Sequence, residues 1–140
     1  MKRTFSTNVN NNAVNFWLLI SRVAIGLSML THGIPKLQML MSGNIQFADP
    51  FGIGTALSLV LCVFAEFVCS VLLILGLATR LAAIPLIINM LVAVFIALSS
   101  EPYGKKELGI IYLLFYFGFL MLGAGKYSID YFIGGKSKRR

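Results

Sequence analysis

Charged residues are scarce in this 140-residue chain: they make up 12% of it, and only five residues are acidic. A soluble domain carries about 25% charged residues. Hydrophobic residues account for 58% of the chain, and its mean hydropathy is +0.85. This combination excludes an ordinary soluble globular protein and predicts a membrane protein.

The chain is also poor in the residues that hold metals and disulfides. Its two cysteines, Cys62 and Cys69, are separated by about 10 Å of helical rise, which is beyond disulfide reach. We therefore expect two buried thiols. The H-E-x-x-H motif, the glycine-rich phosphate loop, the nucleophile elbow and the haem or iron–sulfur ligand patterns are all missing. The sequence thus supports neither a metal site nor hydrolysis, and we expect no covalently bound cofactor.

The shortage of acidic residues leaves a formal net charge of +7. The basic residues are concentrated at the ends of the chain, with Lys2 and Arg3 at its start and "KSKRR" at its end. Basic residues that flank membrane spans set topology and contact anionic headgroups. We therefore expect the bilayer, and not nucleic acid, to be the partner of these charges.

Long apolar runs dominate the rest of the chain. Each is close to the ~20 residues that cross a bilayer as a helix, and backbone groups in lipid must bond within their own segment. The sequence therefore predicts an all-α fold, an integral membrane four-helix bundle. The four expected spans are Ala13–Thr31, Gly54–Ala78, Leu81–Ser99 and Leu108–Ala124.

Three regions follow from these spans. Residues 1–12 form a polar, asparagine-rich tail that we expect to be mobile. Residues 13–130 form the four-span domain, and residues 131–140 form a basic tail. The start of the chain resembles a signal peptide in charge, but no A-x-A-like site follows and Arg22 interrupts the apolar run. We therefore interpret the first span as uncleaved.

The distribution of basic residues predicts the orientation of the spans. If both termini are cytoplasmic, the inner side has eight basic residues and the outer side has three, which is a positive-inside bias. The inner residues are Lys2, Arg3, Arg80, Lys126, Lys136, Lys138, Arg139 and Arg140, and the outer ones are Lys36, Lys105 and Lys106.

The longest connection, residues 32–54, lies between the first two spans. Pro35 is suited to the first turn of a helix, and Leu37, Leu40 and Met41 follow it. We expect a second short helix at the bilayer surface to begin at Pro35. Whether the connection is a lid or only a spacer stays open.

Arg22 lies inside the first span, where an unpaired charge costs about 2.5–3.5 kcal/mol. Counting ~1.5 Å per residue places it about 13 Å from the cytoplasmic edge. Glu66 is the acidic residue within a predicted span, and the same count places it at a depth of about 12 Å from the cytoplasmic edge. We therefore expect Arg22 and Glu66 to form an ion pair between the first two helices.

Asn89 and Tyr116 add polar groups near the same depth, at about 12 and 18 Å. Every predicted helix thus supplies one polar residue near the midplane. Two interpretations stay open: the Arg22–Glu66 pair is a structural clasp, or Arg22, Glu66, Asn89 and Tyr116 line a polar pocket for the head of a lipid-soluble ligand.

A second polar group is expected at the outer edge, where His32 ends the first span, Lys36 follows one turn later and Glu107 opens the fourth span. The pKa of an unperturbed histidine, near 6.5, suits a proton relay. A single interfacial histidine also serves as a cap or an anchor, and both roles stay open.

These features together resemble the DoxX family of small bacterial membrane proteins. The matching stretches are "RVAIGLSMLTHGIPKL", "EFVCSVLLILGLATRLAA", "KKELGIIYLLF" and "GAGKYSID". The polar positions of the pattern fall on Arg22, His32, Lys36, Glu66, Arg80, Glu107 and Asp130. The resemblance implies a multi-pass protein of the bacterial inner membrane that is associated with quinone-linked redox enzymes. The wider superfamily includes members connected with disulfide chemistry, for which this chain lacks a cysteine pair.

Three functions follow as hypotheses. The first is a redox-associated accessory subunit that binds a quinone or another isoprenoid lipid and works with a membrane or peripheral oxidoreductase, since the chain has no electron carrier of its own. The second is a non-catalytic assembly or scaffold protein for a partner enzyme. The third is a small transporter, which needs a homo-oligomer because four helices are few for a pore.

Overall fold

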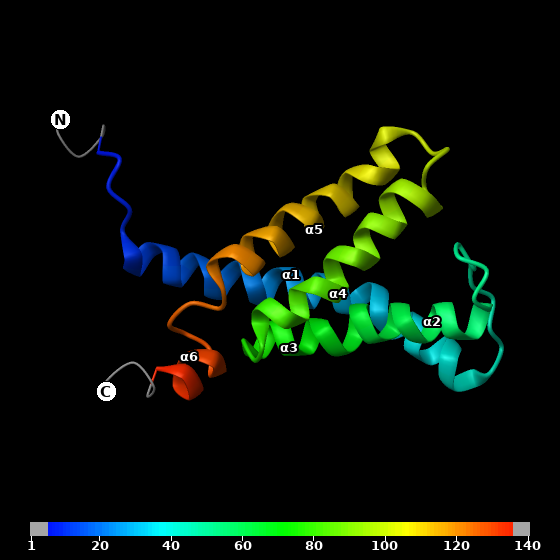
Figure 1. Cartoon of the computed structure of the whole chain (residues 1–140), viewed down its shortest axis with the longest axis horizontal. Helices are drawn as coiled ribbons and strands as arrows, with labels where there is room; N and C mark the ends of the chain where they lie inside the picture. Colours follow the sequence, from blue (N-terminus) through cyan, green and yellow to red (C-terminus); the bar gives the residue numbers. More distant parts are fainter. Residues whose placement is uncertain (1–5, 136–140) are drawn as a thin grey trace.

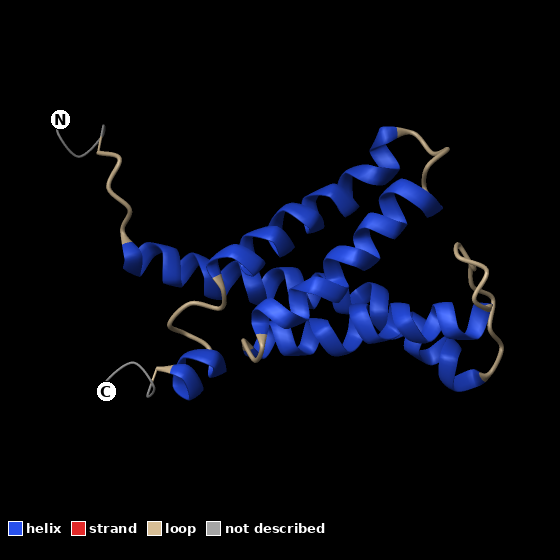
Figure 2. Ribbon diagram, viewed as in Figure 1, coloured by secondary structure: helices blue, strands red, loops and turns tan. Residues whose placement is uncertain are grey.

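The computed structural model describes residues 6–135, and within that range it contains helices and loops but no strand (Figure 2). The all-α prediction is therefore confirmed for the described residues. The elements, in chain order, are α1 (Asn11–Ser42), α2 (Thr55–Val63), η1 (Phe64–Cys69), α3 (Ser70–Leu75), α4 (Thr79–Val92), η2 (Ala93–Ala97), α5 (Tyr103–Leu122) and α6 (Ile129–Gly134).

The first helix is longer than the sequence predicts. It begins after Asn10, whose side chain accepts hydrogen bonds from the backbone amides of Asn12 and Ala13, and it ends at Gly43 with φ 73°. Pro35 lies inside it. The expected second helix beginning at Pro35 is therefore wrong. A proline removes only one backbone donor, and the neighbouring turns of α1 carry the helix past it.

Two helices built from consecutive elements follow, and each contains a π-helical stretch; we call them rods. The first consists of α2, η1 and α3 and runs from Thr55 to Leu75. The second consists of α4 and η2 and runs from Thr79 to Ala97, where the Leu98 amide donates to the Ala93 carbonyl five residues earlier. Single π-helical turns occur frequently at functional sites. Both of these turns flank the pocket described below.

Within residues 6–135, three helices are long and apolar enough to cross a membrane: α1 with 32 residues, Thr55–Leu75 with 21 and Thr79–Ala97 with 19. The fourth predicted span corresponds to α5, whose apolar part follows three charged residues, Lys105, Lys106 and Glu107. All four predicted segments are largely helical, and the largest shift of a boundary is at the end of α1, which lies at Ser42 and not at Thr31.

The helices pack as two layers (Figure 1). The first layer pairs α1 with the Thr55–Leu75 rod, and Gly33 lies at the crossing: a Cβ there would be 2.8 Å from the backbone carbonyl carbon and oxygen of Glu66. The second layer is the α4–α5 hairpin, which inclines away from the first layer toward its own turn. Between the layers lies a core that includes Leu73, Leu86 and Tyr116, each 0% exposed.

The start of α1 and the short helix α6 lie at the same end of the molecule (Figure 1). The basic residues that follow α6, from Lys136 to Arg140, lie outside the described residues, as do residues 1–5 of the predicted N-terminal tail. The connection from Gly43 to Gly54 lies at the opposite end.

Candidate functional site

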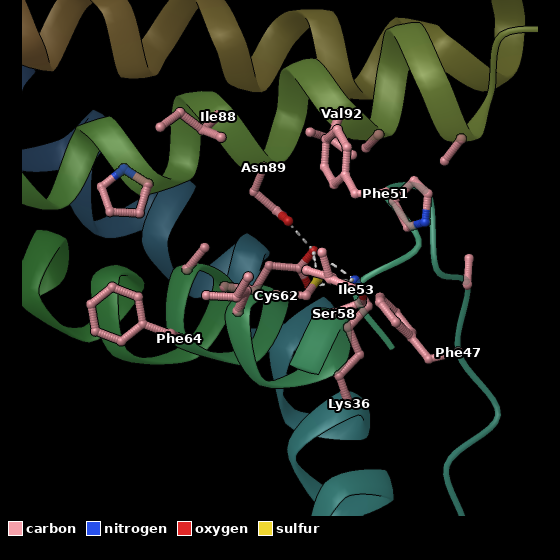
Figure 3. Close-up of a pocket in the computed structure, with 18 of the residues that line it drawn as sticks. Lys36, Phe47, Phe51, Ile53, Ser58, Cys62, Phe64, Ile88, Asn89 and Val92 are labelled. Carbon is pink, nitrogen blue, oxygen red and sulfur yellow. Dashed lines mark hydrogen bonds and ion pairs between the residues drawn. The ribbon is translucent and has the colours of Figure 1, made fainter. Parts of the chain in front are cut away.

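A pocket of about 630 Å³ opens between the Thr55–Leu75 rod and the α4–η2 rod, and we call it the α2–α4 pocket (Figure 3). Its volume lies within the range of about 300–1,000 Å³ that is typical of small-molecule sites. Most of its lining is apolar: Phe47, Ala48, Pro50, Phe51, Ile53, Leu61, Phe64, Ala65, Pro85, Ile88, Val92, Ala93, Ala97 and Leu98. The polar lining residues are Lys36, Ser58, Cys62, Glu66 and Asn89.

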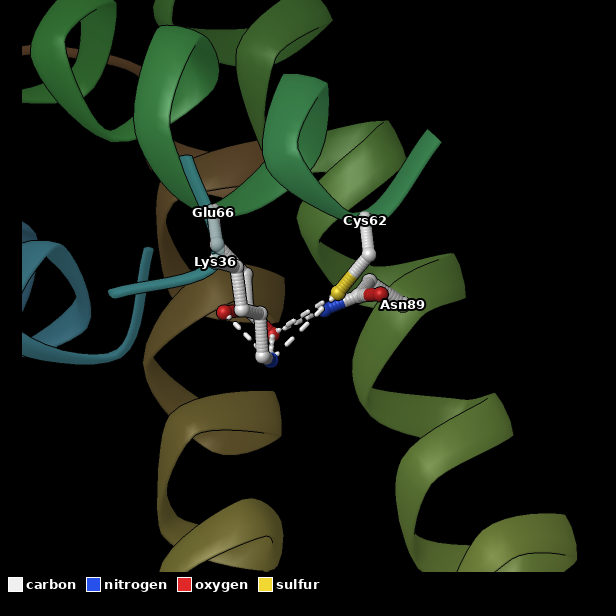
Figure 4. Close-up of polar contacts among 4 residues, drawn as sticks. All are labelled: Lys36, Cys62, Glu66 and Asn89. Carbon is white, nitrogen blue, oxygen red and sulfur yellow. Dashed lines mark hydrogen bonds and ion pairs between the residues drawn. The ribbon is translucent and has the colours of Figure 1, made fainter. Parts of the chain in front are cut away.

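Four of these polar residues form one hydrogen-bonded group, the Lys36 cluster: Lys36, Cys62, Glu66 and Asn89 (Figure 4). The Lys36 ammonium donates to both carboxylate oxygens of Glu66, at 2.6 and 2.7 Å. The Asn89 amide nitrogen donates to Glu66 Oε1 at 2.9 Å, and the Cys62 thiol lies 3.2 Å from the same oxygen. Glu66 is therefore the acceptor that joins α1, η1 and α4.

The packing of α1 explains why the cluster forms here. Gly33 lets α1 approach the backbone of Glu66, and Lys36 stands almost one helical turn later on the same side of α1. Cys62 precedes Glu66 by four residues, so both side chains share one helical face. The Glu66 side chain is 3% exposed and the Lys36 side chain is 28% exposed, so the ion pair is largely shielded from its surroundings.

The connection after α1 covers one side of the pocket. Asp49 accepts hydrogen bonds from the amides of Ile53 and Gly54, at 3.0 and 2.8 Å, and from the Ser58 hydroxyl at 3.1 Å. These bonds, chiefly the one from Gly54, lower the pKa of Asp49 below its ordinary value. The connection is thereby fixed to the start of α2, and the Phe47 ring lies 5.9 Å from the Lys36 ammonium.

The predicted Arg22–Glu66 ion pair is wrong. The Arg22 guanidinium donates to two backbone carbonyls in the loop after α5: to Ala124 at 3.0 Å and to Tyr127 at 2.7 Å. Arg22 is 1% exposed, and a Cβ at Gly76 would collide with its guanidinium. Arg22 therefore holds the loop between α5 and α6 against the turn between α3 and α4.

Asp130 completes that junction at the end of the molecule opposite the connection from Gly43 to Gly54 (Figure 1). Its carboxylate accepts from the amides of Ala78 and Thr79 at the start of α4, and its own amide donates to the Gly76 carbonyl at 2.8 Å. Ala78 has a left-handed φ of 50°, which these bonds stabilise. The "GAGKYSID" segment thus acts as a structural clasp around Arg22.

The length of α1 explains the error in the predicted pairing. The two depths were counted from opposite ends, for Arg22 from Ala13 and for Glu66 from Gly54, and they match only if the first span ends near Thr31. Helix α1 instead continues to Ser42. Glu66 packs against Gly33, which lies eleven residues beyond Arg22, a rise of about 16 Å. The carboxylate therefore meets Lys36 and not Arg22.

The other sequence-predicted ligand residues divide between the pocket and the core. Asn89 lines the α2–α4 pocket and contacts Glu66, so these two predicted residues do lie together. Tyr116 does not line it: its ring is 0% exposed and stacks on Tyr112 at 5.9 Å between centroids. Its hydroxyl is buried without a hydrogen-bond partner among the described residues.

The predicted outer-edge group of His32, Lys36 and Glu107 does not form. Lys36 points to Glu66, while His32 is exposed and meets the Tyr112 ring edge-on at 6.2 Å. Glu107 is exposed and takes part in no ion pair within the described residues. His32 and Lys36 share one face of the continuous helix α1, but the Lys36 ammonium is bound to Glu66 of η1.

Two members of the cluster were not predicted in their observed roles: Cys62 was not among the predicted ligand residues, and Lys36 was not expected to pair with Glu66. The spacing of Cys62 and Glu66 by four residues is a signal for the first. No comparable signal exists for the second, since it depends on the register between α1 and η1. Neither cysteine is in a disulfide; both are buried and free, as expected.

Comparison with known proteins places this fold in a family. The DoxX family model matches residues 17–99, which is more than half of the chain and includes all four members of the Lys36 cluster. A protein of Bacillus subtilis (strain 168), named "Putative oxidoreductase CatD", is 27% identical over 124 residues, covering 88% of this chain and 91% of that protein. No solved structure matches. The chain belongs to the DoxX family of membrane proteins.

Proposed function

We propose that this protein is an accessory membrane subunit of a redox system and that the α2–α4 pocket binds a quinone or a similar isoprenoid lipid. The observation that carries the proposal is the pocket itself: an apolar space of about 630 Å³ with the Lys36 cluster on one side. An apolar site with a few convergent polar groups is the usual form of a small-molecule pocket.

The charges of the cluster favour a neutral head group. Lys36 is the one cationic side chain among the lining residues, and Glu66 neutralises it with a bidentate contact. A phosphate or carboxylate head would have to break that ion pair to find a positive charge. A quinone ring has polar oxygens but no net charge, and it therefore fits the site without disturbing the pair.

The position of the pocket mouth favours entry from the bilayer. Leu61, Phe64 and Ile88 line the pocket and are 54%, 48% and 56% exposed on the outer surface of their helices. These apolar side chains belong to helices long and apolar enough to span a membrane, so they face lipid in the proposed arrangement. A ligand with an isoprenoid tail reaches the pocket between them without crossing water.

The same proposal places α5 as a fourth span, with both termini on the cytoplasmic side of the bacterial inner membrane. Support comes from the apolar residues Leu114, Phe117 and Met121, which are 69%, 45% and 75% exposed on α5. The start of α1 and α6 also lie at one end, as an even number of spans requires (Figure 1). Electrons would reach the ligand from a partner oxidoreductase, in keeping with the name of the Bacillus relative.

Gentle extraction of the purified protein, followed by mass spectrometry of the co-purified lipids, tests the proposal. We expect a quinone to be enriched over the bulk membrane extract. The variant Ile88→Trp places a large ring at the pocket lining and should remove the enrichment. Leu81→Trp is the matched control, since Leu81 lies on the same helix, is 70% exposed and does not line the pocket.

Two results would reject ligand binding. One is the absence of any enriched quinone or isoprenoid lipid in the wild-type extract. The other is equal enrichment in wild type and in folded Ile88→Trp, because the lipid would then be bound elsewhere. If a partner enzyme co-purifies equally well with the protein before and after its bound lipid is removed, the result would favour the scaffold function instead.

A further inference from the structure

We infer that the α2–α4 pocket selects the hydroxyl-bearing, reduced form of its ligand: a quinol or another aromatic diol, over the corresponding dione. This inference rests on the proposed function and specifies the chemistry of the ligand head. It follows from counting which hydrogen-bonding groups of the Lys36 cluster are already used within the protein and which remain for a ligand.

The donors of the cluster are largely committed. Lys36 has three N–H groups; it directs them to Glu66 Oε1, to Glu66 Oε2 and toward Cys62 Sγ at 3.4 Å. The Ser58 hydroxyl donates to Asp49. One N–H of Asn89 donates to Glu66. A ligand carbonyl, which can only accept, therefore finds one uncommitted donor among these groups, the second N–H of Asn89.

The acceptors of the cluster are not all committed. Glu66 Oε2 receives one hydrogen bond among the described residues, from Lys36, although a carboxylate oxygen accepts two or more. The orientation of Asn89 is set by chemistry: its nitrogen must face Glu66, because a carboxylate only accepts. Its Oδ1 therefore points away from Glu66 and has no donor partner among the described residues (Figure 4).

The consequence is a site with spare acceptors beside an apolar space. A diol supplies two O–H donors, and one of them bonds to Asn89 Oδ1 or to Glu66 Oε2 without breaking any contact of the cluster. A dione of the same size buries its oxygens and leaves these acceptors without donors. Discrimination of this kind, between a ligand that satisfies a buried polar group and one that leaves it unpaired, is stronger than discrimination by size.

The test measures binding of three matched probes to the purified protein in detergent under anaerobic conditions. The probes are a short-chain ubiquinone, its quinol and the dimethyl ether of that quinol, which keeps the aromatic ring and both oxygens but carries methyl groups in place of the O–H hydrogens. We expect the quinol to bind about tenfold more tightly than either other probe, the ratio that one net hydrogen bond supplies. The same ratio raises the two-electron midpoint potential of the bound probe by about 30 mV.

Two variants locate the preference. Asn89→Leu removes the free Oδ1 and should reduce the preference severalfold. Ser70→Ala changes a buried hydroxyl outside the pocket that has no hydrogen-bond partner in the described part of the chain, and it should leave the preference unchanged. If Asn89→Leu fails to fold, the comparison of quinol with its dimethyl ether on the wild-type protein still decides the question.

The outcomes separate this inference from the proposed function. Equal binding of the three probes, or tighter binding of the quinone, overturns the preference for the reduced form and leaves the pocket as a lipid site. Failure of all three probes to bind above the detergent background overturns the proposed function and this inference together.

Discussion

The Lys36 ammonium and the Glu66 carboxylate meet at 2.6 and 2.7 Å, across the point where Gly33 brings α1 against η1. With side-chain exposures of 28% and 3%, the pair is much less accessible than the second ion pair of the described chain, Lys105–Glu101, at 62% and 37%. The two pairs therefore provide an internal comparison between a shielded and an exposed contact.

Glu66→Gln should lower the free energy of unfolding by about 3 kcal/mol, because it leaves the Lys36 charge shielded and without a counter-ion. Denaturant titration of the detergent-solubilised protein, followed by circular dichroism, measures the loss.

The matched control is Glu101→Gln, which breaks the exposed pair between the turn before α5 and the first turn of α5 and should cost less than about 0.5 kcal/mol. Lys36→Met combined with Glu66→Gln should regain part of the loss, since no charge is then left unpaired. Equal destabilisation by the two single variants would contradict a special contribution of the shielded pair.

Gly33→Ala should destabilise the protein by about 1–3 kcal/mol, because the added Cβ would lie 2.8 Å from the Glu66 carbonyl and would push α1 away from η1. The same shift should weaken the Lys36–Glu66 contact, so binding to the pocket should fall as well. Thermal unfolding and probe binding measure the two effects.

Gly118→Ala is the control for helix propensity. A Cβ at Gly118 on α5 meets nothing within 4 Å, so this variant should be neutral or gain up to about 1 kcal/mol. A neutral result at Gly33 would show that the two helices separate without cost and that the register of the cluster does not depend on this crossing.

The sequence predicted the helices well because long apolar runs leave a backbone in lipid no alternative to helix formation. Asn89 and Glu66 were also expected to lie together, and they do. The partner of Arg22 was not predictable in the same way. Its partners are the backbone carbonyls of Ala124 and Tyr127. Because every residue has a backbone carbonyl, the residue types in a sequence do not indicate which carbonyls accept.

The pairing of Lys36 with Glu66 was hidden for a different reason. Proline is frequently found at helix boundaries, and the first span was predicted to end at Thr31, before Pro35. Because α1 continues through Pro35, Lys36 moves from the outer edge into the bundle. One undetected helix continuation thus changed the partner of the ion pair, although the class of each element was right.

Arg22→Lys should loosen the loop between α5 and α6 without affecting the pocket. Lysine keeps the charge but cannot reach two carbonyls with a planar fork, so about 1.5–3 kcal/mol of local stability should be lost. Hydrogen exchange should become faster at residues 123–128. Probe binding to the α2–α4 pocket should be unchanged, and a loss of binding in folded Arg22→Lys would revive a direct link between Arg22 and the pocket.

Asp49 provides a pH-dependent contact that holds the connection after α1 to the start of α2. Its pKa is lowered below 3.8, chiefly by the hydrogen bond from the Gly54 amide. A carboxylate with a lowered native pKa stabilises the folded loop above its ordinary pKa, and that contribution disappears as the pH falls through the native value. The loop should therefore stay closed at neutral pH and open only in acid.

The amide proton shifts of Ile53 and Gly54, followed by nuclear magnetic resonance of the detergent-solubilised protein, should titrate with an inflection below pH 3.8. Asp49→Asn should remove the inflection and speed exchange of both amides already at neutral pH, because an amide oxygen accepts their hydrogen bonds less strongly. An inflection at or above 3.8 would mean that the carboxylate gains nothing from these donors. Phe47 and Phe51 would then cover the pocket without Asp49 holding them in place.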